Sequence, residues 1–207
     1  MKKMCRLLVW LSLLLLLSGC PGGGATIPTR YYLIDPAPYT EVEQANNNDL
    51  SIAIMDLQIP QYLERFHIAT RSSENRLVFS ETHQWGESLR KNLLRTMARN
   101  LSGLLGTIDI GTPLNRSVSK PDFSLQIHIE QFEQDSDGRV KLAARWQLLQ
   151  GQNYQPLGTY SAYLESQDVI KQGDYDQMVS VMKTLYADLC KQIAETVLAR
   201  ANNPATS

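Results

Sequence analysis

Cys20 is the residue whose type and position most clearly carry chemistry in this sequence. It follows Leu17-Ser18-Gly19 at the end of an N-terminal stretch that begins with basic residues and continues as an apolar run over residues 7–17. A basic start, a short apolar core and small residues before a cleavage point are typical of a secretory signal peptide. The apolar run is too short to cross a hydrocarbon core of ~30 Å as a helix. We therefore predict that residues 1–19 are a signal peptide.

The thiol of Cys20 gives this signal a specific chemistry, because Leu17-Ser18-Gly19-Cys20 resembles the bacterial lipobox. In that motif the cysteine sulfur receives a diacylglyceryl group, the chain is cleaved just before the cysteine, and the new amino terminus is acylated. Each buried CH₂ contributes ~0.8 kcal/mol, so one acyl chain holds a protein marginally and several hold it stably. The sequence thus predicts lipid attachment at Cys20 and an extracytoplasmic protein. The alternative is an ordinary signal with a chance cysteine.

The histidines do not form a recognisable site. His67, His83 and His128 are far apart, and none has a partner at metal-ligand spacing. The sequence also lacks the HExxH, CxxC and GxSxG motifs and a glycine-rich phosphate loop. We predict no catalytic residue and no cofactor, and we interpret the protein as a non-enzyme.

Four carboxylates close together are the remaining candidates for a metal site: Glu130, Glu133, Asp135 and Asp137. They span the end of an expected strand and a turn. A solvated loop explains this arrangement better than a metal site, so we predict no bound metal.

Charge and cysteine content exclude several classes of partner and linkage. Loss of residues 1–19 leaves 17 Lys+Arg and 21 Asp+Glu, a net charge of −4. This balance argues against nucleic-acid binding and against polybasic attraction to anionic lipid. Cys190 is the only cysteine left once Cys5 is removed and Cys20 is lipidated, which excludes a disulfide within the domain. We expect Cys190 to be a small buried hydrophobe in a helix.

The expected domain organisation is simple. Residues 20–30 form a lipidated, glycine-rich tether, of which residues 21–30 have an r.m.s. reach of roughly 17 Å. A single α+β periplasmic domain follows over residues 31–201, and residues 202–207 form a frayed tail. Pro21 is not the acidic residue that retains some lipoproteins in the inner membrane, so we expect the outer membrane.

Alternation of apolar and polar residues predicts the strands. They are expected at residues 30–34, 50–59, 67–79 (with a turn at 72–75), 123–129, 140–148 and 157–164. The last three strands, joined by short turns, indicate an antiparallel meander with one solvent-exposed face.

Two helices are expected. Apolar residues at steps of three or four from Trp85 to Leu105 predict the first helix, capped by Ser80 or Thr82 and ended by Gly106. Asp174 resembles the cap of the second helix. Together these elements predict an α+β fold: a two-layer sandwich with a mainly antiparallel sheet packed by two amphipathic helices.

With this order in view, the chain resembles the PqiC-like family, the auxiliary lipoprotein components of ABC-type transport. The stretches that carry the resemblance are Leu17–Cys20, Tyr31–Leu33, Ile59–Leu63, Ile68–Arg71, Trp85–Leu89, Phe123–Ile127, Val140–Trp146 and Tyr175–Ile193. Many relatives have Trp-Ala-Glu-Pro-Leu where this chain has Gly86 and Ser88, which loosens the match only locally.

The resemblance implies an outer-membrane lipoprotein that works with an Mce-domain protein and an inner-membrane permease system. Such systems move phospholipid or similar apolar molecules between the two membranes, and ring-like self-association is plausible within the family. A structural or assembly lipoprotein, such as a pilotin or an outer-membrane insertion accessory, would need the same anchor and stays open as an alternative.

One loop is our candidate for partner binding. Pro60 stiffens it, and Tyr62 could supply an aromatic anchor beside Leu63. The alternative is that Tyr62 packs back onto the sheet.

Overall fold

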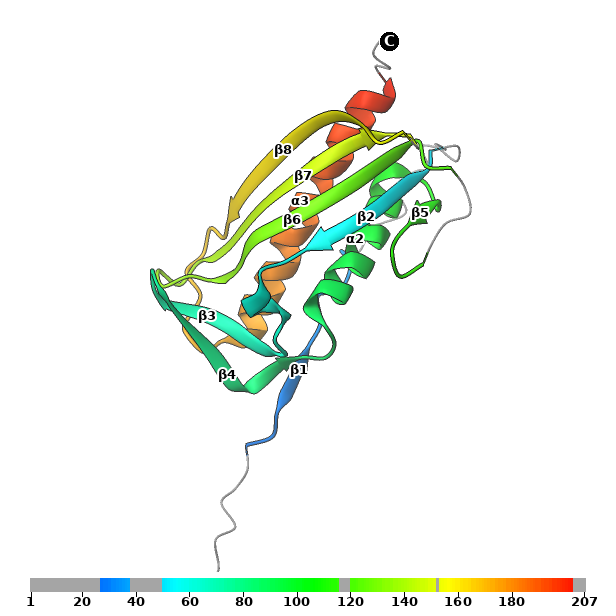
Figure 1. Ribbon diagram of the computed structural model, residues 1–207. Helices are drawn as coiled ribbons and strands as arrows, with labels where there is room; N and C mark the ends of the chain where they lie inside the picture. The colour runs from blue at the N-terminus through cyan, green and yellow to red at the C-terminus, as the bar shows by residue number, and fades with distance from the viewer. Residues whose placement is uncertain (1–26, 38–49, 116–119, 152, 203–207) are drawn as a thin grey trace, which may run out of the picture.

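The computed structural model describes residues 27–37, 50–115, 120–151 and 153–202 (Figure 1). The predicted signal peptide, the lipidation site Cys20 and most of the predicted tail lie outside the described residues. Within them, no helix combines the length and the apolarity needed to span a bilayer.

The predicted elements occur in the predicted order, but β1 and β2 are shorter than expected, the later strands are longer, and β5 has no counterpart among the predicted strands. The strands are β1 Arg30–Tyr32, β2 Ile52–Gln58, β3 His67–Ser73, β4 Arg76–Trp85, β5 Ile110–Gly111, β6 Phe123–Gln134, β7 Val140–Gln150 and β8 Gln155–Glu165. The helices are α2 Leu89–Leu105 and α3 Tyr175–Asn202, and a short 3₁₀ turn, η1, covers Gln61–Glu64.

The described strands form one mixed eight-stranded sheet in which β6 is the central member. On one side β6 pairs antiparallel with β7, and β7 pairs antiparallel with β8, which confirms the predicted meander. On its other side β6 pairs in parallel with β2 and, at its far end, with β3. The β3–β4 hairpin is antiparallel, whereas β1 joins β4 in parallel and β5 joins β2 in parallel. The parallel pairs join segments distant in sequence, which alternation within one segment does not reveal.

Helices α2 and α3 cover one face of this sheet and make the core, as the predicted α+β sandwich requires (Figure 1). Leu93 and Met97 of α2 are fully buried, as are Leu189 and Ile193 of α3. The apolar stripes of both helices are therefore buried within the domain and are not available to a partner.

Polar groups between the two helices are paired. The Tyr186 hydroxyl donates to the carbonyl of Leu93 at 2.9 Å, and the Asn100 amide donates to the Cys190 sulfur at 3.5 Å. Cys190 is fully buried, and burial raises the pKa of its thiol to about 12. It stays a protonated, unreactive thiol, which confirms its prediction as a buried hydrophobe.

The predicted start of the first helix is wrong. β4 continues to Trp85, and α2 begins only at Leu89 with Ser88 in the N-cap position. Trp85 pairs with Tyr32 of β1, so its backbone belongs to the sheet, and its N–H also donates to the Phe66 carbonyl at 2.7 Å. Trp85 and Leu89 are both buried. The four-residue spacing between them therefore reflects burial of both side chains across a strand–helix junction, and not one continuous helix.

The two other predicted helix ends are confirmed. Gly106 has φ 64°, the left-handed conformation that glycine adopts easily, and its N–H donates to the Ser102 carbonyl. The Asp174 carboxylate accepts a hydrogen bond from the N–H of Gln177 at 3.0 Å and so caps α3.

Truncation of Leu93 or Met97 to alanine should lower the free energy of unfolding by ~2–5 kcal/mol, because each leaves a cavity in a closed core. Arg95→Ala should change it by no more than ~0.5–1 kcal/mol, since Arg95 is exposed and pairs with Glu87 at the surface. Urea denaturation of residues 27–207 measures all three variants. A larger loss for Arg95→Ala than for the two core variants would contradict this assignment of helix faces.

Candidate functional site

The loop predicted to bind a partner is held tightly against the sheet. Pro60 precedes η1, whose turn is closed by a hydrogen bond from the Leu63 N–H to the Pro60 carbonyl at 2.9 Å. The side chain of Leu63 is buried in the core, and Pro60 and Tyr62 are half-buried. Tyr62 packs back toward the sheet, as in the alternative weighed above, while Gln61 beside it is exposed. The role of these residues in partner binding stays a prediction.

A buried carboxylate explains why Tyr62 turns inward. Glu133 on β6 is fully buried and accepts hydrogen bonds from the Tyr62 hydroxyl at 2.7 Å and from the Arg71 Nε at 2.6 Å. It also accepts the N–H of Phe132 at 3.0 Å. Burial, reinforced by the charge of Glu133, raises the pKa of Tyr62, so the phenol stays protonated and donates. One carboxylate thereby joins η1, β3 and β6.

The prediction that Glu133 lies in a solvated loop is wrong. β6 continues through it to Gln134, and the β6–β7 register shifts between Ile129 and Gln131. This bulge changes which residues face the helices, so Glu133 turns to the opposite side. There η1 and β3 cover it. An acidic residue at the end of an alternating strand usually marks solvent, and no local sequence signal reveals the cover.

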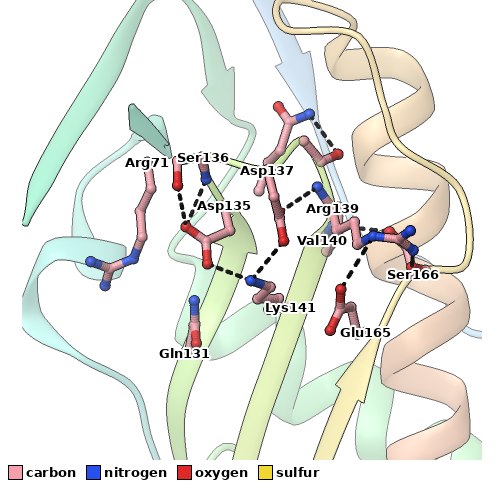
Figure 2. A network of polar contacts seen from close by, with 12 residues as sticks. Arg71, Gln131, Asp135, Ser136, Asp137, Arg139, Val140, Lys141, Glu165 and Ser166 are labelled. Carbon is pink, nitrogen blue, oxygen red and sulfur yellow. Dashed lines mark hydrogen bonds and ion pairs between the residues drawn. The ribbon is translucent and has the colours of Figure 1, made fainter. Parts of the chain in front are cut away.

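The turn after β6 carries a second polar network (Figure 2). The Lys141 ammonium lies between two carboxylates, 2.7 Å from Asp135 and 2.9 Å from Asp137. The hydrogen bond from Lys141 is the main cause that lowers the pKa of Asp135. Nearby, the Arg139 guanidinium donates to the Ser166 carbonyl at 2.8 Å and pairs with Glu165 at 3.4 Å.

Protein cations therefore occupy the places that a metal ion would take in this acidic turn. Among the residues that the structure describes, no group of His, Cys, Asp and Glu is arranged to hold a metal ion. Glu130, the fourth predicted candidate, lies on the exposed face of β6 and pairs with Arg145. The four carboxylates thus separate into three different ion-pair environments.

The sheet face opposite the helices is polar and hollowed. A depression of about 460 Å³ is lined by side chains of four strands: Asp56, Gln58, Gln126, His128, Arg145, Gln147 and Thr159 among them. His128 is exposed, as predicted, and its Nδ1 lies 3.3 Å from the Gln58 amide oxygen. Its described neighbour is thus an amide, and not a nucleophile that it could activate.

An apolar groove lies at the β5 end of the sheet, where the sequence patterns predict no site. It measures about 390 Å³ and is lined in part by Met55, Pro113, Pro121 and Tyr154. Tyr154 is half exposed and has φ 50°, which is uncommon for a residue other than glycine. The sequence signal for this groove is a few isolated apolar residues near prolines. The search for alternating apolar and polar residues does not detect such a signal.

Two further apolar side chains are exposed in the connection between α2 and β6, which also contains Pro113 and Pro121. Ile108 is 98% exposed and Leu114 is 53% exposed. Together with Tyr154 they define what we call the β5-end surface.

The fold and these surfaces define a two-layer α+β domain with one sheet face left open by the helices. A crystal structure of an uncharacterized protein shares the fold with a TM-score of 0.67 and 21% identity, covering 83% of this chain and 99% of that one. A crystal structure of a Xanthomonas campestris protein matches with a TM-score of 0.64 and 11% identity, covering 86% and 98%.

The family follows from the sequence match. The model of the ABC-type transport auxiliary lipoprotein component matches residues 31–194, and the chain belongs to this PqiC-like family. It is similar to the intermembrane transport lipoprotein PqiC of Escherichia coli (strain K12), at 24% identity over 183 residues, covering 87% of this chain and 91% of the relative. The Shigella flexneri protein of the same name matches with the same figures.

Removal of the cation that pairs with Glu133 should destabilise the domain strongly. Arg71→Ala leaves a buried carboxylate without its partner charge and should cost ~3 kcal/mol of unfolding free energy. Arg76→Ala is the matched control, because Arg76 is exposed and should cost no more than ~0.5 kcal/mol. Urea denaturation compares them. Equal, small losses for the two variants would show that Glu133 does not depend on Arg71.

Proposed function

We propose that this protein is an outer-membrane-anchored periplasmic lipoprotein, the auxiliary subunit of an Mce-type system that moves lipid between the two membranes. In this role it contributes to envelope integrity, binds an Mce-domain protein linked to an inner-membrane permease system, and performs no chemistry itself. The family match over residues 31–194 is the observation that carries the proposal. The similar PqiC protein, which is named an intermembrane transport lipoprotein, supports it.

The geometry of the domain suits an anchored subunit that presents a surface to a partner. The described chain enters at β1, and the β5-end surface lies at the opposite end of the molecule (Figure 1). α2 spans the distance between them, about 25 Å for its 17 residues at 1.5 Å per residue. A partner that approaches from the periplasm would meet the β5-end surface, whereas the loop around Tyr62 lies nearer the anchored end.

Self-association is a further part of the proposal. Among the described strands, β8 pairs with β7 alone, so no described strand covers its other edge. An open edge can pair with another chain. A ring of copies would place several β5-end surfaces around one partner.

Replacement of the lipidated residue tests the anchor. Cys20→Ala should leave an uncleaved precursor without acyl groups, because no other thiol stands at the lipobox position. Metabolic labelling with a radioactive fatty acid measures this. Equal label in the variant and the parent would exclude Cys20 as the attachment site.

Site-specific photocrosslinking in cells tests the partner. We expect a photoreactive residue at Leu114, in the β5-end surface, or at Gln61, beside the predicted loop, to capture an Mce-domain protein. Both positions are exposed, and so is the control position Glu195 on α3, which should capture none. Capture of a secretin or an outer-membrane barrel protein in place of an Mce-domain protein would favour an assembly role and reject the transport proposal.

A further inference from the structure

The segment around β1 carries exposed apolar side chains, close in sequence to the predicted lipid anchor. Tyr31 is 67% exposed and Leu33 is 43% exposed, and Ile27 just before the strand is 74% exposed. The alternate residue Ile34 is fully buried. Tyr31 and Leu33 therefore share the face that turns away from the core.

This face is held rigidly by contacts from its other side. The N–H of Ile34 donates to the Asn92 side chain at 2.8 Å, and the Thr96 hydroxyl donates to the Ile34 carbonyl at 2.7 Å. Both partners belong to α2. The direction of Tyr31 and Leu33 is thus set by the folded domain and not by the tether that precedes it.

A fourth apolar side chain lies at the same end. Tyr31 pairs with Gln84, and the next residue of β4, Trp85, donates its N–H to the carbonyl of Phe66, which is 56% exposed. We call Ile27, Tyr31, Leu33 and Phe66 the β1-end patch.

Two arginines near this end are paired with carboxylates of the domain. Arg30 lies 3.5 Å from Asp176, and Arg90 lies 3.9 Å from Glu64. Arg65, next to Phe66, lies with its guanidinium 4.6 Å from the centre of the Phe79 ring. The exposed apolar side chains are therefore what this end offers to an apolar partner.

The length of the preceding chain indicates what covers the patch. Ten residues, 21–30, lie between Cys20 and Tyr31, which gives an r.m.s. separation of roughly 16–19 Å for a flexible chain. A protein anchored by acyl chains at Cys20 thus keeps the patch beside the bilayer at high effective concentration. The distant β5-end surface lies about one helix length farther away.

We propose that the β1-end patch is a second membrane contact, which seats the domain on the bilayer that holds its acyl chains. The inference rests on the proposed lipidation of Cys20. Tyrosine suits this position because its ring is apolar and its hydroxyl is polar, as at membrane–water interfaces. The contact orients the domain with its β5-end surface toward the periplasm, so the acyl chains hold the protein and the patch sets its direction.

Depth-dependent fluorescence quenching tests this contact on the full lipidated chain. The purified protein is inserted into vesicles of phosphatidylethanolamine and phosphatidylglycerol (3:1) that contain a lipid quencher. A fluorophore is attached to Leu33→Cys, to Phe66→Cys or, as the distant control, to Ile108→Cys. Cys190 is fully buried and escapes labelling. Quenching at positions 33 and 66 should exceed that at 108 by at least about threefold, since interfacial side chains enter the bilayer by ~5–10 Å.

A pair of matched variants separates seating from mere tethering. With the probe at position 66, Tyr31→Ser/Leu33→Ser should reduce quenching to the level at position 108. The control Leu114→Ser/Tyr154→Ser removes apolar groups from the other end and should leave quenching unchanged. All four residues are exposed, so neither variant should alter the denaturation midpoint.

The outcomes distinguish this inference from the proposed function. Weak quenching at 33 and 66 in a chain shown by mass spectrometry to be acylated at Cys20 overturns the inference and leaves the transport role intact. Stronger quenching at position 108 than at 33 and 66 overturns it as well, because the membrane would then contact the β5 end. Crosslinking between two copies through position 33 also overturns it, because a second copy would then cover the β1-end patch. A mature chain without acyl groups overturns both proposals.

Discussion

Burial of one face of the sheet, with β6 at its centre, against α2 and α3 is the contact on which the rest of this structure depends. β6 is the strand that joins the β7–β8 meander to β2 and to the β3–β4 hairpin. Its inward residues Leu125, Ile127 and Ile129 lie in the core with both helices. Two helices suffice to cover one face of the sheet. Most of the opposite face and both ends of the domain therefore stay in contact with solvent.

The bulge in β6 adds a second constraint, because it turns Glu133 out of the helix-facing core and into a small polar interior. A buried carboxylate is costly unless it is paired and hydrogen-bonded, and Arg71 and Tyr62 meet that requirement here. These contacts come from η1 and from β3, so the charge also determines how the loop and the hairpin sit on the sheet. The polar group specifies an arrangement that apolar packing alone would leave less defined.

The arrangement of the surfaces fits a protein that works between a membrane and a partner. In the sequence the predicted lipid-anchor signal precedes β1. In the structure β1 lies at one end of α2 and β5 near the other (Figure 1), and exposed apolar side chains are found at both ends. The acidic turn after β6 is neutralised by Lys141 and Arg139. The exposed apolar side chains at the two ends therefore contrast with the paired charges of this turn.

The sequence by itself determined the features whose physical cause is local. The caps at Asp174 and Gly106, the apolar stripe with Leu93 and Met97, and the β6–β8 meander all follow from spacing over a few residues, and the order of motifs sufficed to indicate the family. The lipobox at Cys20 rests on the same kind of local pattern and stays a prediction. The tertiary structure alone decided what depends on distant segments. Spacing assigns Trp85 to a helix, because only its pairing with Tyr32 of β1 shows it to be strand. Local pattern assigns Glu133 to solvent, because its cover comes from residues more than 60 positions away. The parallel pairs of β2 with β6 and of β1 with β4, and the exposure of Tyr31 and Ile108, likewise arise only when the chain is folded, since local alternation carries no information on which segments meet.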